Sequence, residues 1–332
     1  MRSSISVSGI ETLRVTPIDS AGMGAIVVEA VEDDATLAAW LELRNAILPW
    51  WPMDLESVLH ARARARARQR VELVARVDGE LAGGGVAAVP GTSGDAGVAF
   101  GNVFVPVERR RAGIGSAVFA RVANEARGWG KTRLEVVVSE TDGDGLAFLR
   151  PRGFEEVARS WQAVLPLARL VPEAVDVPPG VTITTLDVRP DLARSLYEVE
   201  QEAVADIPAP EPGVVGSFEE WRRREVDSPL VRPESWFLAV ADEQVVGHAL
   251  LILQPSRPGV GWHEMTGVRR AWRGRGVAAA LKRAQIAWAV AHGLERLETE
   301  THADNVPMRR LNERLGYLAE PATVTLRGPL PD

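Results

Sequence analysis

Two segments of the chain place arginines and small residues where an apolar strand leads into a helix. Residues 105–115 read VPVERRRAGIG, and residues 268–278 read VRRAWRGRGVA. An Arg-x-x-Gly-x-(Gly or Ala) turn at a helix start presents main-chain N–H groups at the positive end of the helix dipole, and its small residues let the backbone wrap around phosphate oxygens. The spacing predicts two anion sites suited to a pyrophosphate, with a ligand-free tight turn as the alternative. Their residues are Val105, Arg110, Arg111, Ala112, Gly113, Ile114 and Gly115, and Arg273, Gly274, Arg275, Gly276, Val277 and Ala278.

The two halves of the chain stay similar beyond these turns. Gly113 and Gly276 are 163 residues apart, and the same offset relates Gly153 to Gly316. A period of this length is far longer than a solenoid repeat. It predicts a duplicated domain.

A second motif follows in the C-terminal half, where residues 305–317 read NVPMRRLNERLGY. With the two turns, this segment resembles the GNAT acetyltransferase superfamily, present as two tandem copies. The family's Arg/Gln-x-x-Gly-x-Gly/Ala turn matches both halves, and its Asn-x-x-Met-x-x-x-Asn-x-x-Leu-Gly-Tyr/Phe segment matches the second. The layout is similar to that of mycothiol synthase, another tandem protein of similar length.

The resemblance implies acetyl-CoA as the co-substrate that donates the acyl group. It places the pyrophosphate on the amides of residues 273–278 and the pantetheine arm along Thr266, Gly267 and Val268. It also implies a hydrogen bond from Asn305 to that arm. The N–H of Val268 would then polarise the thioester carbonyl, and direct attack by an acceptor amine is the family's usual reaction.

Such an attack needs an unprotonated amine, and therefore a base that acts directly or through water. Because side chains alternate along a strand, Trp262, Glu264, Thr266 and Val268 are expected to share the face that bears the donor. Glu264 is the candidate base or amine-positioning carboxylate, at a place where the resemblance also implies a base. The alternatives are a structural carboxylate paired with an arginine, and His263 as the base, although His263 is expected on the other face.

The proton for the departing thiolate has a less obvious source. Where many members of the family carry a tyrosine, this chain has Asn312, and Leu149 in the first half. We expect either Asn312 with a water or no dedicated acid, because a thiol with a pKa of ~8.5 needs little help to leave. Tyr317 is expected in the core, and Tyr197 is a candidate for the acceptor pocket.

The two copies differ where the chemistry is expected. At the 163-residue offset, Glu264 corresponds to Gly101, and Asn305 corresponds to Asp142. We therefore expect the C-terminal copy to catalyse. The N-terminal copy is expected to be structural or to bind acetyl-CoA without turnover.

Alternating strand and helix patterns predict an α/β protein with mixed sheets. The resemblance implies two tandem GNAT-type domains, each with a mostly antiparallel sheet flanked by helices: an N-terminal domain over 1–165, a Pro-rich linker over 166–180 and a C-terminal domain over 181–332. Expected strands are 26–31, 71–77, 81–89, 98–105, 134–139, 161–165, 181–186, 236–240, 245–253, 262–268, 297–301 and 323–327, with an extra strand within 10–19. Expected helices are 33–48, 60–70, 114–127, 145–149, 191–205, 276–291 and 307–314, with another around Trp221.

Composition narrows the class of protein further. The net charge of −7 argues against nucleic acid as the main partner. No apolar run reaches the ~18 residues of a membrane span, and residues 1–10 lack the apolar core of a secretory signal, so the cytoplasm is the expected location. The chain has no cysteine, and its five histidines show no metal-ligand spacing, so no metal is expected. A monomer or a homodimer is expected.

The acceptor is expected to be a small-molecule amine. The region 197–221 is acidic, which would attract a cation or simply form a solvated helix face. Its acidic residues are Glu198, Glu200, Glu202, Asp206, Glu211, Glu219 and Glu220. A polyamine, an amino-sugar or amino-acid-like antibiotic and, by resemblance to mycothiol synthase, a cysteinyl pseudodisaccharide all stay open. The alternative function classes are a non-catalytic acyl-CoA-binding regulatory protein and a nucleotide-binding module.

Overall fold

The chain forms two compact units in the computed structural model. Unit 1 holds the described residues of 1–90, 97–136 and 328–332, and unit 2 holds those of 91–96 and 137–327. The structure describes residues 13–15, 24–49, 52–56, 58–59, 62, 69–89, 96–208, 213–228, 231–253 and 257–331.

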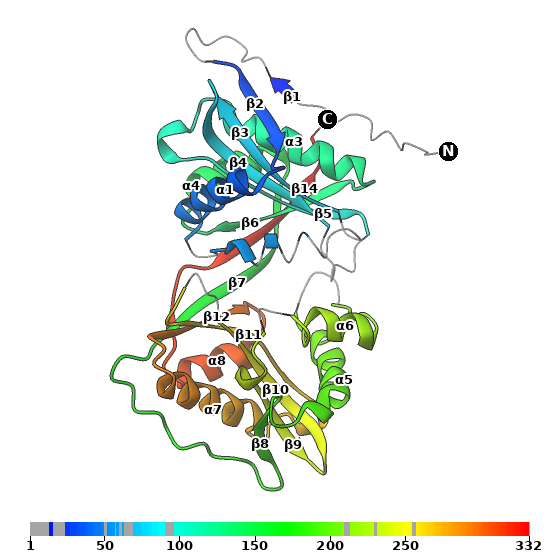
Figure 1. Ribbon diagram of the computed structural model, residues 1–332, viewed down its shortest axis with the longest axis vertical. Coiled ribbons are helices and arrows are strands. Elements are labelled where there is room, and N and C mark those ends of the chain that lie inside the picture. The colour runs from blue at the N-terminus through cyan, green and yellow to red at the C-terminus, as the bar shows by residue number, and fades with distance from the viewer. Residues whose placement is uncertain are drawn as a thin grey trace. The chain divides into compact units, whose positions relative to one another are not determined.

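Unit 1 is built on one mixed sheet with helices on both faces (Figure 1). Its strands, in spatial order, are β1 (Leu13–Val15), β2 (Ile26–Ala30), β3 (Arg70–Val77), β4 (Glu80–Ala88), β5 (Val98–Phe104) and β6 (Arg133–Ser139), whose last residues belong to unit 2. Neighbouring strands are antiparallel except β5 and β6, which run parallel. Helix α1 (Asp34–Ile47) packs Leu37 and Trp40 on one face of the sheet. Helix α3 (Ile114–Gly128) covers the other face, where a Cβ on Gly85 would lie 2.7 Å from Val118 Cγ1, so glycine allows the close packing.

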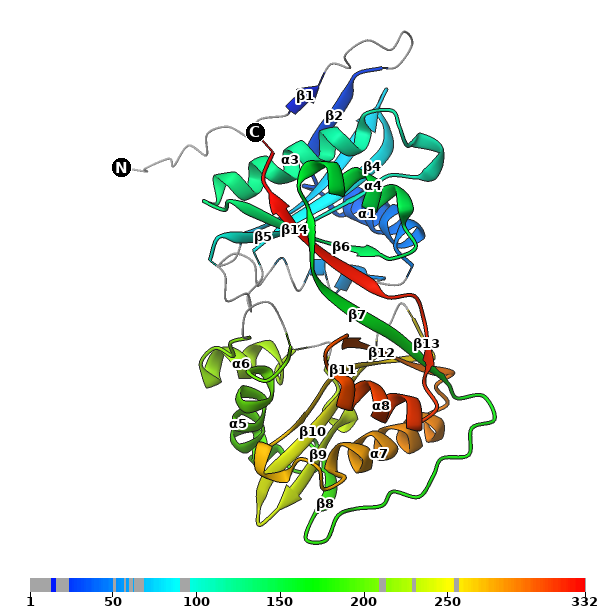
Figure 2. The same ribbon diagram turned by 180° about the vertical axis from the view of Figure 1, so that it is seen from behind.

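Unit 2 repeats this arrangement around its own run of neighbouring strands (Figures 1 and 2). Its strands, in spatial order, are β7 (Glu155–Pro166), β12 (Arg296–His302), β11 (Val260–Val268), β10 (Gln244–Leu253), β9 (Trp236–Ala241) and β8 (Thr182–Thr185), and β13 (Leu318–Ala319) and β14 (Thr323–Pro329) also pair with β7. Helices α5 (Ala193–Val204) and α6 (Phe218–Arg224) share a core with one face, which contains Tyr197, Trp221 and Leu250. Helix α7 (Val277–Ala291) packs Val277 and Leu281 on the opposite face. Two short helices complete the unit, α4 (Gly143–Leu149) and α8 (Val306–Arg314).

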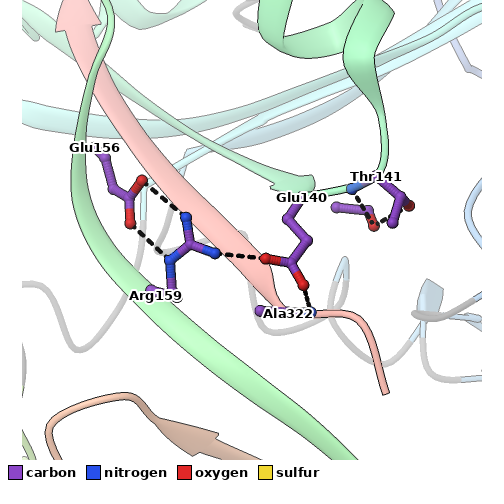
Figure 3. Close-up of polar contacts among 6 residues, drawn as sticks. Glu140, Thr141, Glu156, Arg159 and Ala322 are labelled. Atoms are coloured by element: carbon purple, nitrogen blue, oxygen red, sulfur yellow. Dashed lines mark hydrogen bonds and ion pairs between the residues drawn. The ribbon is translucent and has the colours of Figure 1, made fainter. Parts of the chain in front are cut away.

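Strand β7 links the two sequence copies in a way that the sequence does not reveal. It precedes the predicted linker, yet it pairs antiparallel with β12 and β14 of the second copy. Figure 3 shows how Arg159 of β7 donates to Glu140 at 2.6 Å and to Glu156 at 2.9 Å, while Glu140 accepts the N–H of Ala322 at 2.8 Å just before β14. These contacts fix the paired strands β7 and β14. The predicted limits of the two domains stay predictions.

Most predicted helices and strands are confirmed to within a few residues. Asp33 caps α1 by accepting the N–H of Thr36 at 2.8 Å, and the hairpin turn at Asp78 and Gly79 has φ angles of 52° and 87°. The strand predicted over 161–165 begins at residue 155, and β13 was not predicted. Most of the helix predicted over 60–70 lies outside the described residues.

Candidate active site

The basic turn of the second copy has the conformation that an anion site requires. Gly274 and Gly276 have φ angles of 73° and 88°, a region that favours glycine. Gly276 is the N-cap of α7, no side chain caps this helix end, and the N–H of Ala280 donates to the carbonyl of Gly276. The N–H groups of Val277 and Ala278 therefore point out of the helix at its positive end.

The first copy repeats the same main-chain path. Gly113 is the N-cap of α3 with a φ of 82°, and again no side chain caps the helix. Arg111, with a φ of 63°, takes the left-handed position that a glycine holds in the second copy. The predicted duplication of the turn is thus confirmed in its backbone conformation.

One arginine of each turn braces the strand before it. Arg110 Nε donates to the carbonyl of Val105 at 3.2 Å, and Arg273 Nε donates to the carbonyl of Val268 at 3.0 Å. The two contacts occupy corresponding positions in the copies. These arginines therefore hold the conformation of the turn, which is a structural role in addition to the anion-binding role predicted for them.

An acidic residue that follows α5 neutralises part of the second turn. Asp206 Oδ1 lies 2.6 Å from Arg270 Nη2, and its Oδ2 lies 2.7 Å from Arg273 Nη2. Hydrogen bonds from these two arginines lower the pKa of Asp206 to about 2. Arg275 is exposed, with its guanidinium carbon 5.0 Å from the ring centroid of Trp272. Among the described residues no carboxylate pairs with Arg275, so its charge is not compensated there.

The strands that lead to the two turns separate from their parallel neighbours. β11 pairs with β12 from Val260 to His263, and β5 pairs with β6 from Val98 to Phe100. Beyond these residues, β11 continues to pair with β10, and β5 with β4. One edge of β11 and one edge of β5 are therefore released from pairing with the next strand.

Main-chain groups of β11 point to this released edge. The N–H of Arg269 donates to the carbonyl of Val246 on β10 at 3.0 Å. Because peptide groups alternate in direction along a strand, the N–H groups of Thr266 and Val268 point away from β10. The edge thus presents two N–H donors close to the start of α7, and the predicted oxyanion role of Val268 is compatible with this direction.

Strand β11 contains a β-bulge at Glu264. Met265 pairs with Leu250 and His263 pairs with Leu251, so Glu264 is an extra residue without a partner on β10. A bulge re-aims side chains and restarts the alternation of the strand. Glu264 is therefore placed by a local irregularity rather than by regular strand geometry.

Because of the bulge, Glu264 and Val268 do not lie on the same face of the strand. Trp262 pairs with Ile252, which packs in the α5/α6 core, and the indole of Trp262 donates to Glu264 Oε2 at 3.1 Å. Val268, by contrast, packs with Val277 of α7 on the opposite face. The prediction that Glu264 and Val268 share a face is wrong, because the extra residue shifts the alternation by one.

The prediction that Glu264 corresponds to Gly101 of the first copy is also wrong. β5 pairs with β4 without a register shift, so the described part of β5 has no such bulge. Phe100 pairs with Glu135 of β6, and Trp262 pairs with Glu298 of β12. Glu135 and Glu298 correspond at the 163-residue offset, so Phe100 corresponds to Trp262 and Gly101 to His263. Glu264 has no counterpart in the first copy.

The surroundings of Glu264 are strongly acidic. Its side chain reaches solvent, yet desolvation by the surrounding protein raises its pKa, as do the negative charges of Glu225, Glu200 and Glu300. The hydrogen bond from Trp262 acts in the opposite direction. Within the described part of the chain no arginine forms an ion pair with Glu264, which disfavours the purely structural interpretation of this carboxylate. A raised pKa brings a carboxylate closer to the range in which it can exchange a proton with an amine.

His263 faces away from this acidic region, as predicted. It is buried against α7, with Nε2 in contact with the hydroxyl of Tyr317. Burial and the charge of Lys282 lower the pKa of His263 well below its usual range. Tyr317 is buried, as predicted for a core residue.

The two predicted asparagines occupy different environments. Asn305 is the N-cap of α8 and accepts the N–H of Met308 at 3.3 Å through Oδ1, which leaves its amide nitrogen as a donor. Asn312 is buried and donates to Thr301 Oγ1 at 3.3 Å, while its Oδ1 has no partner among the described residues. The roles predicted for Asn305 and Asn312 stay predictions.

Much of the predicted acidic acceptor region is engaged in structural contacts. Tyr197 is buried and donates from its hydroxyl to the carbonyl of Gly216 at 2.8 Å. Glu198 pairs with Arg269 at 2.9 Å, and Glu220 completes a capping box at the start of α6. Glu211 lies outside the described residues. Sequence reasoning did not single out Glu225 and Glu300, whose only signal was their charge.

The described residues show neither a metal site nor a membrane-spanning helix. No group of three or more His, Cys, Asp or Glu side chains is arranged to hold a metal ion there. None of the described helices has the length and apolar character needed to cross a bilayer.

Two regions of the chain, residues 28–154 and 194–317, match the family model described as the acetyltransferase (GNAT) family. The chain belongs to the acetyltransferase (GNAT) family. The predicted tandem arrangement of two GNAT copies is confirmed by these two matches. Membership of this family makes the chain an acyltransferase. The comparison with curated proteins gave no match.

Solved structures share the tandem GNAT fold. A GCN5-related N-acetyltransferase from Sphaerobacter thermophilus has a TM-score of 0.74 at 22% identity, covering 92% of this chain and 96% of its own. A tandem GNAT protein from the clavulanic acid biosynthesis pathway has a TM-score of 0.73 at 22% identity, covering 92% and 99%. A GNAT acetyltransferase from Colwellia psychrerythraea has a TM-score of 0.61 at 13% identity, covering 92% and 99%. These likenesses confirm the predicted α/β fold class.

Proposed function

We propose that this GNAT chain is an acetyl-CoA-dependent N-acetyltransferase that acts on a primary amine of a small molecule, with catalysis in unit 2. The observation that carries the proposal is the bulge of β11. Glu264 is the extra residue of this bulge, and the same strand carries the edge N–H groups of Thr266 and Val268 and leads to the uncapped start of α7. The described part of the first copy retains the turn and lacks the bulge.

The residues of unit 2 fit a donor with a diphosphate and an extended amide-containing arm. The N–H groups of Val277 and Ala278, with Arg275, would hold the diphosphate. Those of Thr266 and Val268 would hydrogen-bond the arm and the thioester carbonyl. When bound, the donor supplies the activated acetyl group. The protein's own contribution is to orient that group and to offer donors where negative charge develops.

Glu264 would prepare the acceptor for direct attack. An acceptor amine arrives as an ammonium ion, which has no lone pair for the thioester carbon. The carboxylate of Glu264 would accept one proton, directly or through water, and the neutral amine would then attack the thioester carbon in a ternary complex. The C–S bond breaks, and the second proton of the attacking nitrogen passes to the departing thiolate, which leaves as free thiol. The surrounding carboxylates would favour the approach of a cation.

The direct test is a screen of small amines with acetyl-CoA, read as release of free thiol and as mass increase of the amine. We expect amine-dependent thiol release and a higher melting temperature with acetyl-CoA than with ATP. A shift in melting temperature without turnover on any amine would favour an acyl-CoA-binding regulatory protein instead. A shift with ATP and none with acetyl-CoA would refute the donor assignment.

The two bracing arginines form a matched pair that locates the active copy. Arg273→Ala is expected to raise the KM for acetyl-CoA by about tenfold, because it loosens the turn that would hold the diphosphate and leaves the negative charge of Asp206 paired with Arg270 alone. Arg110→Ala removes the corresponding contact from unit 1 and is expected to leave kcat unchanged. Steady-state kinetics of both variants checks this prediction, and a larger loss of turnover in Arg110→Ala would move catalysis to the first copy.

A further inference from the structure

A chain of three side chains in unit 2 ends at Glu200, one of the carboxylates whose negative charge acts on Glu264. His248 of β10 is fully buried, and its Nδ1 accepts the indole N–H of Trp236 at 3.2 Å. This contact leaves the proton of the neutral imidazole on Nε2. Nε2 lies 2.8 Å from Oε2 of Glu200, close enough for an ion pair, although the two atoms lack the directional geometry of a hydrogen bond. A buried imidazole edge therefore faces the carboxylate of Glu200.

The opposite strand leaves room for this imidazole. Gly267 of β11 pairs with His248, and a Cβ on Gly267 would lie 2.8 Å from His248 Nε2. In unit 1 the corresponding pair is reversed: Gly84 of β4 faces Phe104 of β5, whose ring would lie 2.7 Å from a Cβ on Gly84. The fold therefore accepts an apolar aromatic side chain at this position. The polar contacts among Trp236, His248 and Glu200 in unit 2 are thus not required by the fold.

Glu200 differs from the other two carboxylates that act on Glu264, because each of those accepts a hydrogen bond or pairs with an arginine. Glu225 is paired with Arg224 at 2.5 Å, and Glu300 accepts the amide of Gln162 at 2.5 Å. Among the described residues, His248 is the only ion-pair partner of Glu200, and its proton arrangement makes it neutral. Oε2 of Glu200 is also shielded from solvent and accepts no hydrogen bond within the described chain. A shielded carboxylate without a cation is costly, which points to a cation supplied by a ligand.

We propose that Glu200 binds a second cationic group of the acceptor, so that the substrates are diamines or amines with another permanent positive charge. This inference rests on the proposed acetyltransferase function. One amine of the acceptor loses its proton near Glu264 and is acetylated, while the other keeps its charge beside Glu200. Trp236 and His248 are positioning residues, because they fix the side of the Glu200 carboxylate that faces the protein.

The experiment compares putrescine with butylamine, which differ by one amino group. The wild-type protein is expected to prefer putrescine by about tenfold or more in kcat/KM, since a charge-assisted hydrogen bond to a shielded carboxylate is worth at least that factor. Glu200→Gln should abolish most of this preference, mainly through a higher KM for putrescine. Trp236→Phe removes the indole N–H together with part of this buried ring, and it should reduce the preference in the same direction.

Glu313→Gln is the matched control, because Glu313 is an exposed carboxylate on α8, outside the acidic region 197–221. It should leave the preference between the two amines unchanged. Equal use of both amines by the wild-type protein, or an equal effect of Glu200→Gln and Glu313→Gln, would overturn the inference while leaving the acetyltransferase proposal intact. Absence of thiol release with every amine would instead be a failure of the proposed function.

Discussion

Replacement of Glu264 by glutamine is expected to lower kcat by about 10²–10³-fold near neutral pH. Glutamine keeps the size of the side chain and can still accept the indole N–H of Trp262, so the bulge should keep its shape. It cannot take a proton from an ammonium group at this pH. The loss should therefore appear in turnover, measured as thiol release at saturating acetyl-CoA, more than in the melting temperature.

The pH profile tests the same assignment with a definite sign. A base works only when it is deprotonated, so wild-type activity should rise with pH through the pKa of Glu264, which lies above the ordinary value of 4.5. Trp262→Phe removes the hydrogen bond that lowers this pKa, and the rise should move to higher pH. Glu264→Gln should lose this rise and regain rate only as the free amine itself deprotonates under alkaline conditions.

Glu313→Gln serves as the control for both measurements, because Glu313 is an exposed carboxylate on α8. Its kcat and its pH profile should match those of the wild-type protein. Full activity of Glu264→Gln, or an unchanged rise in the Trp262→Phe profile, would remove Glu264 from the mechanism.

The turns could be predicted from sequence because local conformation there depends on residues that the sequence shows directly. Gly276 and Gly113 occupy left-handed positions at helix starts, and few other residues do so without strain. Two copies at a constant offset made the interpretation stronger than one copy would. The helices and strands around the turns followed from periodicity for the same local reason.

Strand β11 could not be predicted to the same depth, because a bulge is a property of two strands. The alternation read from residues 262–268 is sound for a regular strand, but the partner β10 skips one residue of β11 at Glu264. Nothing in β11 alone marks that position. The pairing of Asp206 with Arg273 and the placement of β7 in unit 2 are likewise contacts between distant segments, which composition and spacing do not encode.

Lys282→Met is expected to stabilise the protein, by up to ~5 kcal/mol below about pH 7, which is the free energy equivalent to the shift in the pKa of this lysine. Lys282 is buried on α7, where Nζ has no hydrogen-bond partner among the described residues and lies 5.1 Å from the ring centroid of Tyr317. Burial lowers its pKa from 10.5 to about 7. The corresponding residue of α3 in unit 1 is Phe119, which is also buried, so the site accepts an apolar side chain.

The sign of the pH dependence follows from the two protonation states. Below about pH 7 the lysine is protonated in both the folded and the unfolded chain, and the full penalty of burying a charge is present. Between about pH 7 and 10.5 only the unfolded chain holds the extra proton, so wild-type stability rises with pH relative to the variant. The stabilisation by Lys282→Met should therefore shrink steadily across this window.

Urea unfolding at several pH values measures this difference, and Lys131→Met is the natural control. Lys131 and Lys282 are the only lysines of the chain, so two side-chain signals in a lysine-labelled NMR sample would report both titrations. One signal should titrate near pH 7, and it should disappear in Lys282→Met. If Lys282→Met destabilised the protein at pH 6, the buried ammonium would have a partner that offsets its desolvation, and Lys282 would then be a structural cation rather than a largely neutral amine.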